Sequence, residues 1–226
     1  MRKGSSLTRA GRSAHRAAAT RRPQDCPPPR VLGTATPDRL SRQLADRIPR
    51  MERHHRAVAE LAGSLARHIG LRDEQLHAVV RAAELHDVGK VLVPDAILNK
   101  PAELSEDELA LMRRHAIAGW LILRESAESD AIAALVRSSH ERWDGKGYPD
   151  GLVGDDIPLP ARIICACDAY SAMTTNRSYR DAMPESEALA ELRNCAGSQF
   201  DPRVVDALER VVARETPQRL SERLAA

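Results

Sequence analysis

Apolar residues recur at every third or fourth position along most of this chain, which is the spacing of helices that bury one face. The clearest stripe runs through Val58, Leu61, Leu65 and Ile69 and stops before Gly70. Glycine often follows the last turn of a helix, because it readily adopts the left-handed backbone found there. The pattern therefore predicts a helix that ends at Ile69.

The same spacing continues toward the C-terminus, and the period-two alternation typical of strands is absent from the sequence. Ser105 and Glu108 have the spacing of a capping box, and Asp201 before Pro202 is typical of a helix start. A glycine-rich loop is expected at residues 144–149. Further helices are predicted near residues 76–86, 105–123, 130–140, 161–175, 184–195 and from 202 onward. The sequence thus predicts an all-α helical bundle of about seven helices.

His86 and Asp87 stand side by side where one of these apolar stripes ends, and Gly89 and Lys90 follow them. Neighbouring histidine and aspartate residues at a helix end offer an imidazole nitrogen and a carboxylate that can share a metal ion. Lys90, three positions after Asp87, can face the same point from the next turn. This segment is the first candidate site.

Four more potential metal ligands fall on the apolar faces of other predicted helices: His54, His115, His140 and Asp168. His54, for example, lies four residues before Val58 and therefore faces the bundle interior. A buried carboxylate such as Asp168 is costly without a partner, and a metal ion supplies one. A mixed set of imidazoles and carboxylates suits iron, manganese or nickel better than zinc. The six residues together predict a metal centre.

Each of these histidines taken singly has a structural explanation as a core or helix-terminal residue. Only their joint occurrence with His86 and Asp87 favours a metal centre. Three other histidines differ from them in helical phase and are predicted to lie on the surface: His55, His68 and His77.

Residues 1–36 contain eight Lys or Arg and one Asp, so their charge of +7 leaves −5 for the rest of a chain whose total is +2. They lack apolar periodicity and contain proline clusters, which predicts a disordered basic tail or a start codon assigned too far upstream. A nucleic-acid or membrane-surface arm and a transit peptide are the alternatives. The folded domain is expected at residues 37–216, with a short tail at 217–226.

The four cysteines form no CxxC pair and no disulfide framework, so they are predicted to be free thiols in a reducing cytoplasm. No apolar run approaches the roughly 18–20 residues that a membrane-spanning helix needs. The expectation is therefore a cytoplasmic protein whose folded domain has neither a membrane span nor a nucleic-acid partner.

The order of the six candidate ligands resembles that of the HD superfamily of metal-dependent phosphohydrolases, and in particular the HD-GYP family of cyclic di-GMP phosphodiesterases. The resemblance covers residues 50–212 or so and is carried by LHDVGKVLVPDAILNKPAELSEDE, RRHAIAGW, SHERWDGKGYPDGLVGDDIPLPARII, CDAYSAMTTNRSYR and AGSQFDPRVV. It implies an HD-type helical bundle, two divalent ions (iron or manganese), and hydrolysis of a cyclic dinucleotide.

The resemblance also implies roles for individual residues. The metal ligands would be His54, His86, Asp87, His115, His140 and Asp168. Asp87 would bridge the two ions, and Lys90 would contact the phosphate under attack, which makes both of them catalytic. Arg177 and Arg180 would hold the phosphates of the substrate, and Tyr148 belongs to a loop near the nucleotide. This loop, the GYP loop at residues 144–149, is also an expected contact for protein partners.

Three residues depart from the family pattern. Ser139 replaces the first histidine of His-His-Glu, which removes an imidazole and weakens the second metal site. Arg50 stands where members with three metals have a glutamate, which argues against a third ion. Ser171 replaces the second aspartate of Asp-x-x-Asp-Ala, which puts the supporting role of that position in doubt.

Two alternatives to a cyclic di-GMP phosphodiesterase therefore stay open. The first alternative is an HD-type phosphohydrolase for another nucleotide or phosphodiester. The second is a catalytically weak module that binds cyclic di-GMP or a partner protein.

Overall fold

The computed structural model describes residues 36–48, 50–126, 128–176 and 181–225, with side chains up to residue 214. The predicted basic tail, apart from Thr36, lies outside the described residues. The described residues belong to one compact unit, Leu32–Ala226. None of its described helices is both long and apolar enough to cross a lipid bilayer.

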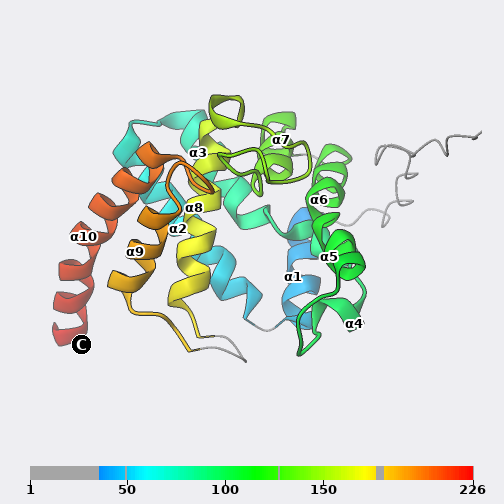
Figure 1. Ribbon diagram of the computed structural model, residues 1–226, viewed down its shortest axis with the longest axis horizontal. Helices are drawn as coiled ribbons and strands as arrows, with labels where there is room; N and C mark the ends of the chain where they lie inside the picture. Colours follow the sequence, from blue (N-terminus) through cyan, green and yellow to red (C-terminus); the bar gives the residue numbers. More distant parts are fainter. Residues whose placement is uncertain (1–35, 49, 127, 177–180, 226) are drawn as a thin grey trace, which may run out of the picture. The chain divides into compact units, whose positions relative to one another are not determined.

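Helices connected by loops make up this unit (Figure 1). The α-helices are α1 (Pro37–Arg47), α2 (Met51–Ile69), α3 (Asp73–Leu85), α4 (Asp95–Leu98), α5 (Glu106–Arg113), α6 (His115–Arg124), α7 (Asp130–Ser138), α8 (Leu159–Thr174), α9 (Glu185–Asn194) and α10 (Pro202–Ala225). Two 3₁₀ helices, η2 (Val88–Leu92) and η3 (Gly154–Asp156), lie between them. The part of the chain that the structure describes contains no β-strand, only two isolated bridges, which confirms the all-α prediction.

Helix α2 is the centre of the bundle and packs against α1, α3, α8 and α10. Its buried face includes Val58, Leu61 and Leu65, as the apolar stripe predicts. Figure 1 shows α9 and α10 on one side of α8 and the α4–α6 group on the other. The core lies where α2, α3 and α8 meet, so side chains at this junction come from segments far apart in the sequence.

Most predicted helix ends agree with the structure. Gly70 follows α2 with a left-handed φ of 104°, and Ser105 and Glu108 form the capping box of α5. The predicted helix at 105–123 is instead two helices that break at Arg114. At this break His115 Nδ1 donates to the Met112 carbonyl at 2.8 Å, a local contact between a side chain and the backbone of the preceding helix.

The turn that carries Lys90 is held tightly against α6. A Cβ on Gly89 would come within 2.0 Å of the His115 carbonyl oxygen and 2.5 Å of the Gly119 amide nitrogen, so only glycine fits there. From the other side, Arg47 at the end of α1 donates to the Val91 carbonyl at 2.7 Å. These contacts fix η2 beside the helix that begins with His115.

Candidate metal centre

The six predicted ligands come from five separate parts of the chain and converge on one region. His54 lies on α2, His86 caps the C-terminus of α3, Asp87 precedes η2, His115 begins α6, His140 follows α7, and Asp168 lies on α8. Five of them form two groups of three ligand atoms, each within 4.8 Å of one another: His54, His86 and Asp87, and Asp87, His115 and His140. Asp87 belongs to both groups.

The two carboxylate oxygens of Asp87 face different groups of imidazoles. Its Oδ2 lies 3.4 Å from His86 Nε2, whereas its Oδ1 lies 3.3 Å from His115 Nε2 and 3.8 Å from His140 Nε2. Asp168 extends the first group, because its Oδ1 lies 2.9 Å from His54 Nε2 and 3.8 Å from His86 Nε2. This is the arrangement expected of a carboxylate that bridges two ions.

His86 and His115 are oriented by the same local contact. In each, Nδ1 lies 2.8 Å from the carbonyl three residues earlier, that of Ala83 or Met112. A carbonyl oxygen only accepts hydrogen bonds, so Nδ1 carries the proton, and the Nε2 lone pair of the neutral ring is directed at the centre. Metal-binding histidines are commonly fixed in this way.

Burial keeps the imidazoles of the second group neutral. It lowers the pKa of His115 to about 4 and that of His140 to about 3. For Asp87, burial alone would raise the pKa, but the charge of the nearby Lys90 outweighs this effect and holds the pKa well below its ordinary value. Neutral imidazoles around ionised carboxylates are the protonation states that bind a cation.

Two buried polar atoms at the centre have the chemistry of cation ligands. His86 Nε2 and Asp87 Oδ1 are shielded from solvent, yet neither has a hydrogen-bond partner among the described residues. Leaving buried polar atoms unpaired costs free energy, so such atoms are rare in folded proteins. Divalent ions coordinated by these two atoms would satisfy them, and the donor set of imidazole and carboxylate fits iron or manganese.

One side of the centre is open. The side chains of His86, Asp87 and His115 are at most 3% exposed, but Lys90 is 21% and Asp168 28% exposed. The Nζ of Lys90 lies 2.7 Å from Asp87 Oδ2, because residues three apart lie on the same side of a 3₁₀ turn. A ligand that reaches the centre from this side therefore meets an ammonium group next to the bridging carboxylate.

The predicted phosphate-binding arginines, Arg177 and Arg180, lie outside the described residues. The segment before them is anchored by Arg50, whose Nη1 donates to the Asn176 carbonyl at 2.9 Å. An arginine at the position of the family's additional glutamate thus contacts the backbone instead of offering a carboxylate to a third ion.

Two residues, Glu141 and Tyr148, hold the GYP loop and the residues after it next to the candidate metal centre. Glu141 is buried and accepts hydrogen bonds from the backbone amides of Asp150, Gly151 and Leu152 at 2.7–3.1 Å. Tyr148 stacks on the imidazole of His140, with centroids 5.2 Å apart and an interplanar angle of 16°. The predicted nucleotide contact, Tyr148, therefore also supports a candidate ligand, and Glu141 has a role that sequence reasoning missed.

The two serines that depart from the family pattern have different environments. Ser139 is buried and donates from Oγ to the Val136 carbonyl of its own helix at 2.9 Å. Ser171 lies with its Oγ 3.0 Å from His54 Nδ1, on the ring edge opposite Asp168. Ser171 can therefore fix the ring of His54, whereas the Ser139 hydroxyl is engaged by its own helix.

This difference leads to a paired prediction. Ser171→Ala is expected to weaken metal binding about tenfold, because histidine ligands lose affinity when the group that orients them is removed. Ser139→Ala, the matched control, should leave metal affinity unchanged, because the Ser139 hydroxyl donates to the Val136 carbonyl of its own helix. Isothermal titration of the metal-free variants with Mn²⁺ measures both affinities. Equal affinities for the two variants would contradict the assigned role of Ser171.

His55 is the clearest error of the sequence analysis. It was predicted to lie on the surface, but it is only 6% exposed and its Nε2 lies 3.7 Å from Asp87 Oδ2. The buried face of α2 is wider than a single stripe and includes Met51 and Ala59, each four residues from His55. That second stripe was the available signal. His77, by contrast, is exposed as predicted.

In this helical bundle, histidines and a second aspartate surround one shared carboxylate, that of Asp87. Such an arrangement is typical of metal-binding hydrolases. The comparison with known families agrees with this class. The HD domain family matches residues 38–204, and the chain belongs to that family. The recognition of an HD-type bundle from the sequence is thereby confirmed.

Individual relatives narrow the resemblance. The chain is 41% identical to the cyclic di-GMP phosphodiesterase response regulator RpfG of Xanthomonas campestris, over 77% of this chain and 47% of that protein. It is 38% identical to the 3′3′-cGAMP-specific phosphodiesterase 2 of Vibrio cholerae, over 69% of this chain and 30% of that protein. The chain thus spans less than half the length of these relatives.

A solved structure supports the fold. Bd1817, an HDG"Y"P protein from Bdellovibrio bacteriovorus, superposes with a TM-score of 0.59 over 78% of this chain and 62% of that one, at 18% identity. At this level of identity the likeness concerns the fold alone.

Proposed function

We propose that the chain is a metal-dependent phosphodiesterase that hydrolyses cyclic di-GMP at a centre of two divalent ions. The observation that carries this proposal is Asp87, whose Oδ2 faces the imidazole of His86 and whose Oδ1 faces those of His115 and His140. The naming of RpfG as a cyclic di-GMP phosphodiesterase supports the choice of substrate. The proposed ligands are His54, His86, Asp87, His115, His140 and Asp168.

The residues of the chain would divide the work between binding and orientation. When bound, iron or manganese ions supply an activated water molecule and neutralise charge on the phosphate. Lys90, on the open side, would bind a non-bridging oxygen of the phosphate, and Arg177 and Arg180 would hold the substrate through charge-assisted hydrogen bonds. Orienting the scissile bond in this way favours in-line attack. The GYP loop, with Tyr148 near the nucleotide, is a further proposed contact for protein partners.

A second candidate substrate is supported by the relative that acts on 3′3′-cGAMP. The two substrates share the cyclic phosphodiester backbone that the metal centre would recognise, and they differ only in one base. A non-catalytic module that binds cyclic di-GMP is the remaining alternative.

A substrate panel tests the proposal. Protein loaded with Fe²⁺ or Mn²⁺ is incubated with cyclic di-GMP, 3′3′-cGAMP, cyclic di-AMP and a simple aryl phosphodiester, and the products are followed by chromatography. Cyclic di-GMP is expected to be hydrolysed fastest. Faster turnover of 3′3′-cGAMP would support the second candidate, and binding of cyclic di-GMP without turnover of any compound would contradict the enzymatic proposal.

A further inference from the structure

His55 lies next to the candidate ligand His54 on α2 but contacts a different part of the centre. Its ring packs edge-on against that of His86, with centroids 5.1 Å apart and an interplanar angle of 68°. Its Nε2 is shielded from solvent and lies 3.7 Å from Asp87 Oδ2. His55 thus approaches the bridging carboxylate, whereas His54 contacts Asp168.

The position of His55 excludes it from both groups of candidate ligands. The ligand atoms that lie within 4.8 Å of one another include His54 and His86 but not His55. A bare lone pair on Nε2 would repel the carboxylate of Asp87, whereas an Nε2–H is attracted to it. The favoured tautomer therefore directs a donor at Asp87 and cannot bind a metal through the same atom.

The carboxylate of Asp87 is contacted asymmetrically. The Nζ of Lys90 lies 2.7 Å from Oδ2, and His55 approaches the same oxygen. The 3.7 Å between His55 Nε2 and Asp87 Oδ2 exceeds the length of a hydrogen bond, so the attraction between them is electrostatic. The low polarity of the interior strengthens this attraction. Oδ1, which has no hydrogen-bond partner among the described residues, remains directed at His115 and His140.

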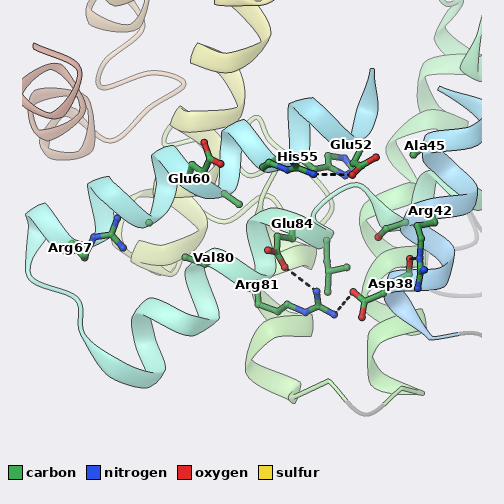
Figure 2. A pocket seen from close by; sticks show the side chains of 15 residues that line it. Asp38, Arg42, Ala45, Glu52, His55, Glu60, Arg67, Val80, Arg81 and Glu84 are labelled. Atoms are coloured by element: carbon green, nitrogen blue, oxygen red, sulfur yellow. Dashed lines mark hydrogen bonds and ion pairs between the residues drawn. The ribbon is translucent and has the colours of Figure 1, made fainter. Parts of the chain in front are cut away.

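A cavity of about 770 Å³ lies on the other side of His55, between α1, α2 and α3. Figure 2 shows His55 at its wall, together with Arg81, which forms ion pairs with Asp38 and Glu84. None of the six candidate metal ligands lines this cavity. The polar lining gives space for a polar side chain other than imidazole at position 55, so substitutions there can be tolerated by the fold.

We propose that His55 is a positioning residue, whose Nε2–H fixes the rotation of the Asp87 carboxylate so that each oxygen faces its own metal ion. The inference rests on the proposed metal centre but not on the substrate. His55 directly follows the candidate ligand His54, and it would affect metal binding without coordinating the metal itself.

Two amide substitutions separate positioning from packing. In His55→Gln the amide nitrogen can occupy the place of Nε2, whereas in His55→Asn the shorter side chain brings the amide only to the place of Nδ1, too far from Asp87. Metal-free protein is titrated with Mn²⁺ by calorimetry, without nucleotide. His55→Asn is expected to weaken Mn²⁺ binding about tenfold and His55→Gln by less than about threefold, in line with the effect of groups that orient metal ligands. His77→Asn, at an exposed histidine, is the matched control.

Thermal unfolding of the metal-free variants accompanies the titration. The two metal-free variants are expected to unfold at similar temperatures, and added Mn²⁺ should stabilise His55→Gln more than His55→Asn. Equal Mn²⁺ affinities for the two variants, whether normal or reduced, would overturn the inference. If the parent protein itself binds no Mn²⁺ or Fe²⁺, the proposed metal centre fails and the role of His55 fails with it. A parent that binds metal normally while both variants match it overturns the role of His55 alone.

Discussion

Asp87→Asn is expected to abolish the proposed hydrolysis of cyclic di-GMP and to reduce bound metal from the proposed two ions per chain to one or none. The substitution keeps the size of the side chain but removes the charge that both groups of imidazoles share. The expected loss of turnover is at least roughly 1,000-fold, comparable with the removal of a single group that stabilises charge in other active sites. Elemental analysis of the purified variant and a hydrolysis time course measure the two effects.

Asp156→Asn is a suitable control for this experiment, because Asp156 is an exposed aspartate on η3. It should retain parental metal content and turnover. Should Asp87→Asn bind as much metal as the parent protein, Asp87 does not bridge two ions.

Gly89→Ala is expected to destabilise the whole domain. The added methyl group would lie 2.0 Å from the His115 carbonyl oxygen and 2.5 Å from the Gly119 amide nitrogen, and neither backbone atom can rotate away. Overpacking of this kind costs about 3 kcal/mol, which corresponds to a fall in melting temperature of roughly 6–12 °C for a domain of this size. Thermal unfolding followed by circular dichroism measures the change. Displacement of His115 should also weaken metal binding.

Gly63→Ala is the matched control for this second prediction. A Cβ on Gly63, in the middle of α2, would first meet the Val80 side chain at 3.0 Å, and a side chain can move. Alanine is also favoured over glycine inside a helix by about 1 kcal/mol, which offsets that contact. A melting temperature for Gly89→Ala equal to that of Gly63→Ala would show that η2 is not held against α6.

Local sequence patterns were sufficient to predict most of the helices. The apolar stripe of α2, its glycine terminus and the capping box of α5 depend on residues a few positions apart, and each agrees with the structure. The break at Arg114, where the His115 ring donates to the Met112 carbonyl, leaves no trace in hydrophobic periodicity. The narrow gap between η2 and α6 likewise depends on the tertiary approach of two segments.

The candidate site was predicted to a similar extent. The six candidate ligands could be found because each lies on an apolar face or in a family motif, and the structure brings them together. The supporting residues were harder to predict. Glu141 acts through backbone amides nine to eleven residues later, and Ser171 acts on a histidine more than a hundred residues earlier. His55 was misplaced because α2 buries a wider arc than the one stripe considered.

The central claim is that Asp87 bridges two metal ions. The most direct measurement is a crystal structure of iron- or manganese-loaded protein with diffraction data collected at the absorption edge of the metal. We predict two anomalous peaks in contact with Asp87, one bounded by His54 and His86 and the other by His115 and His140. A single peak, or peaks that do not contact Asp87, would contradict the claim.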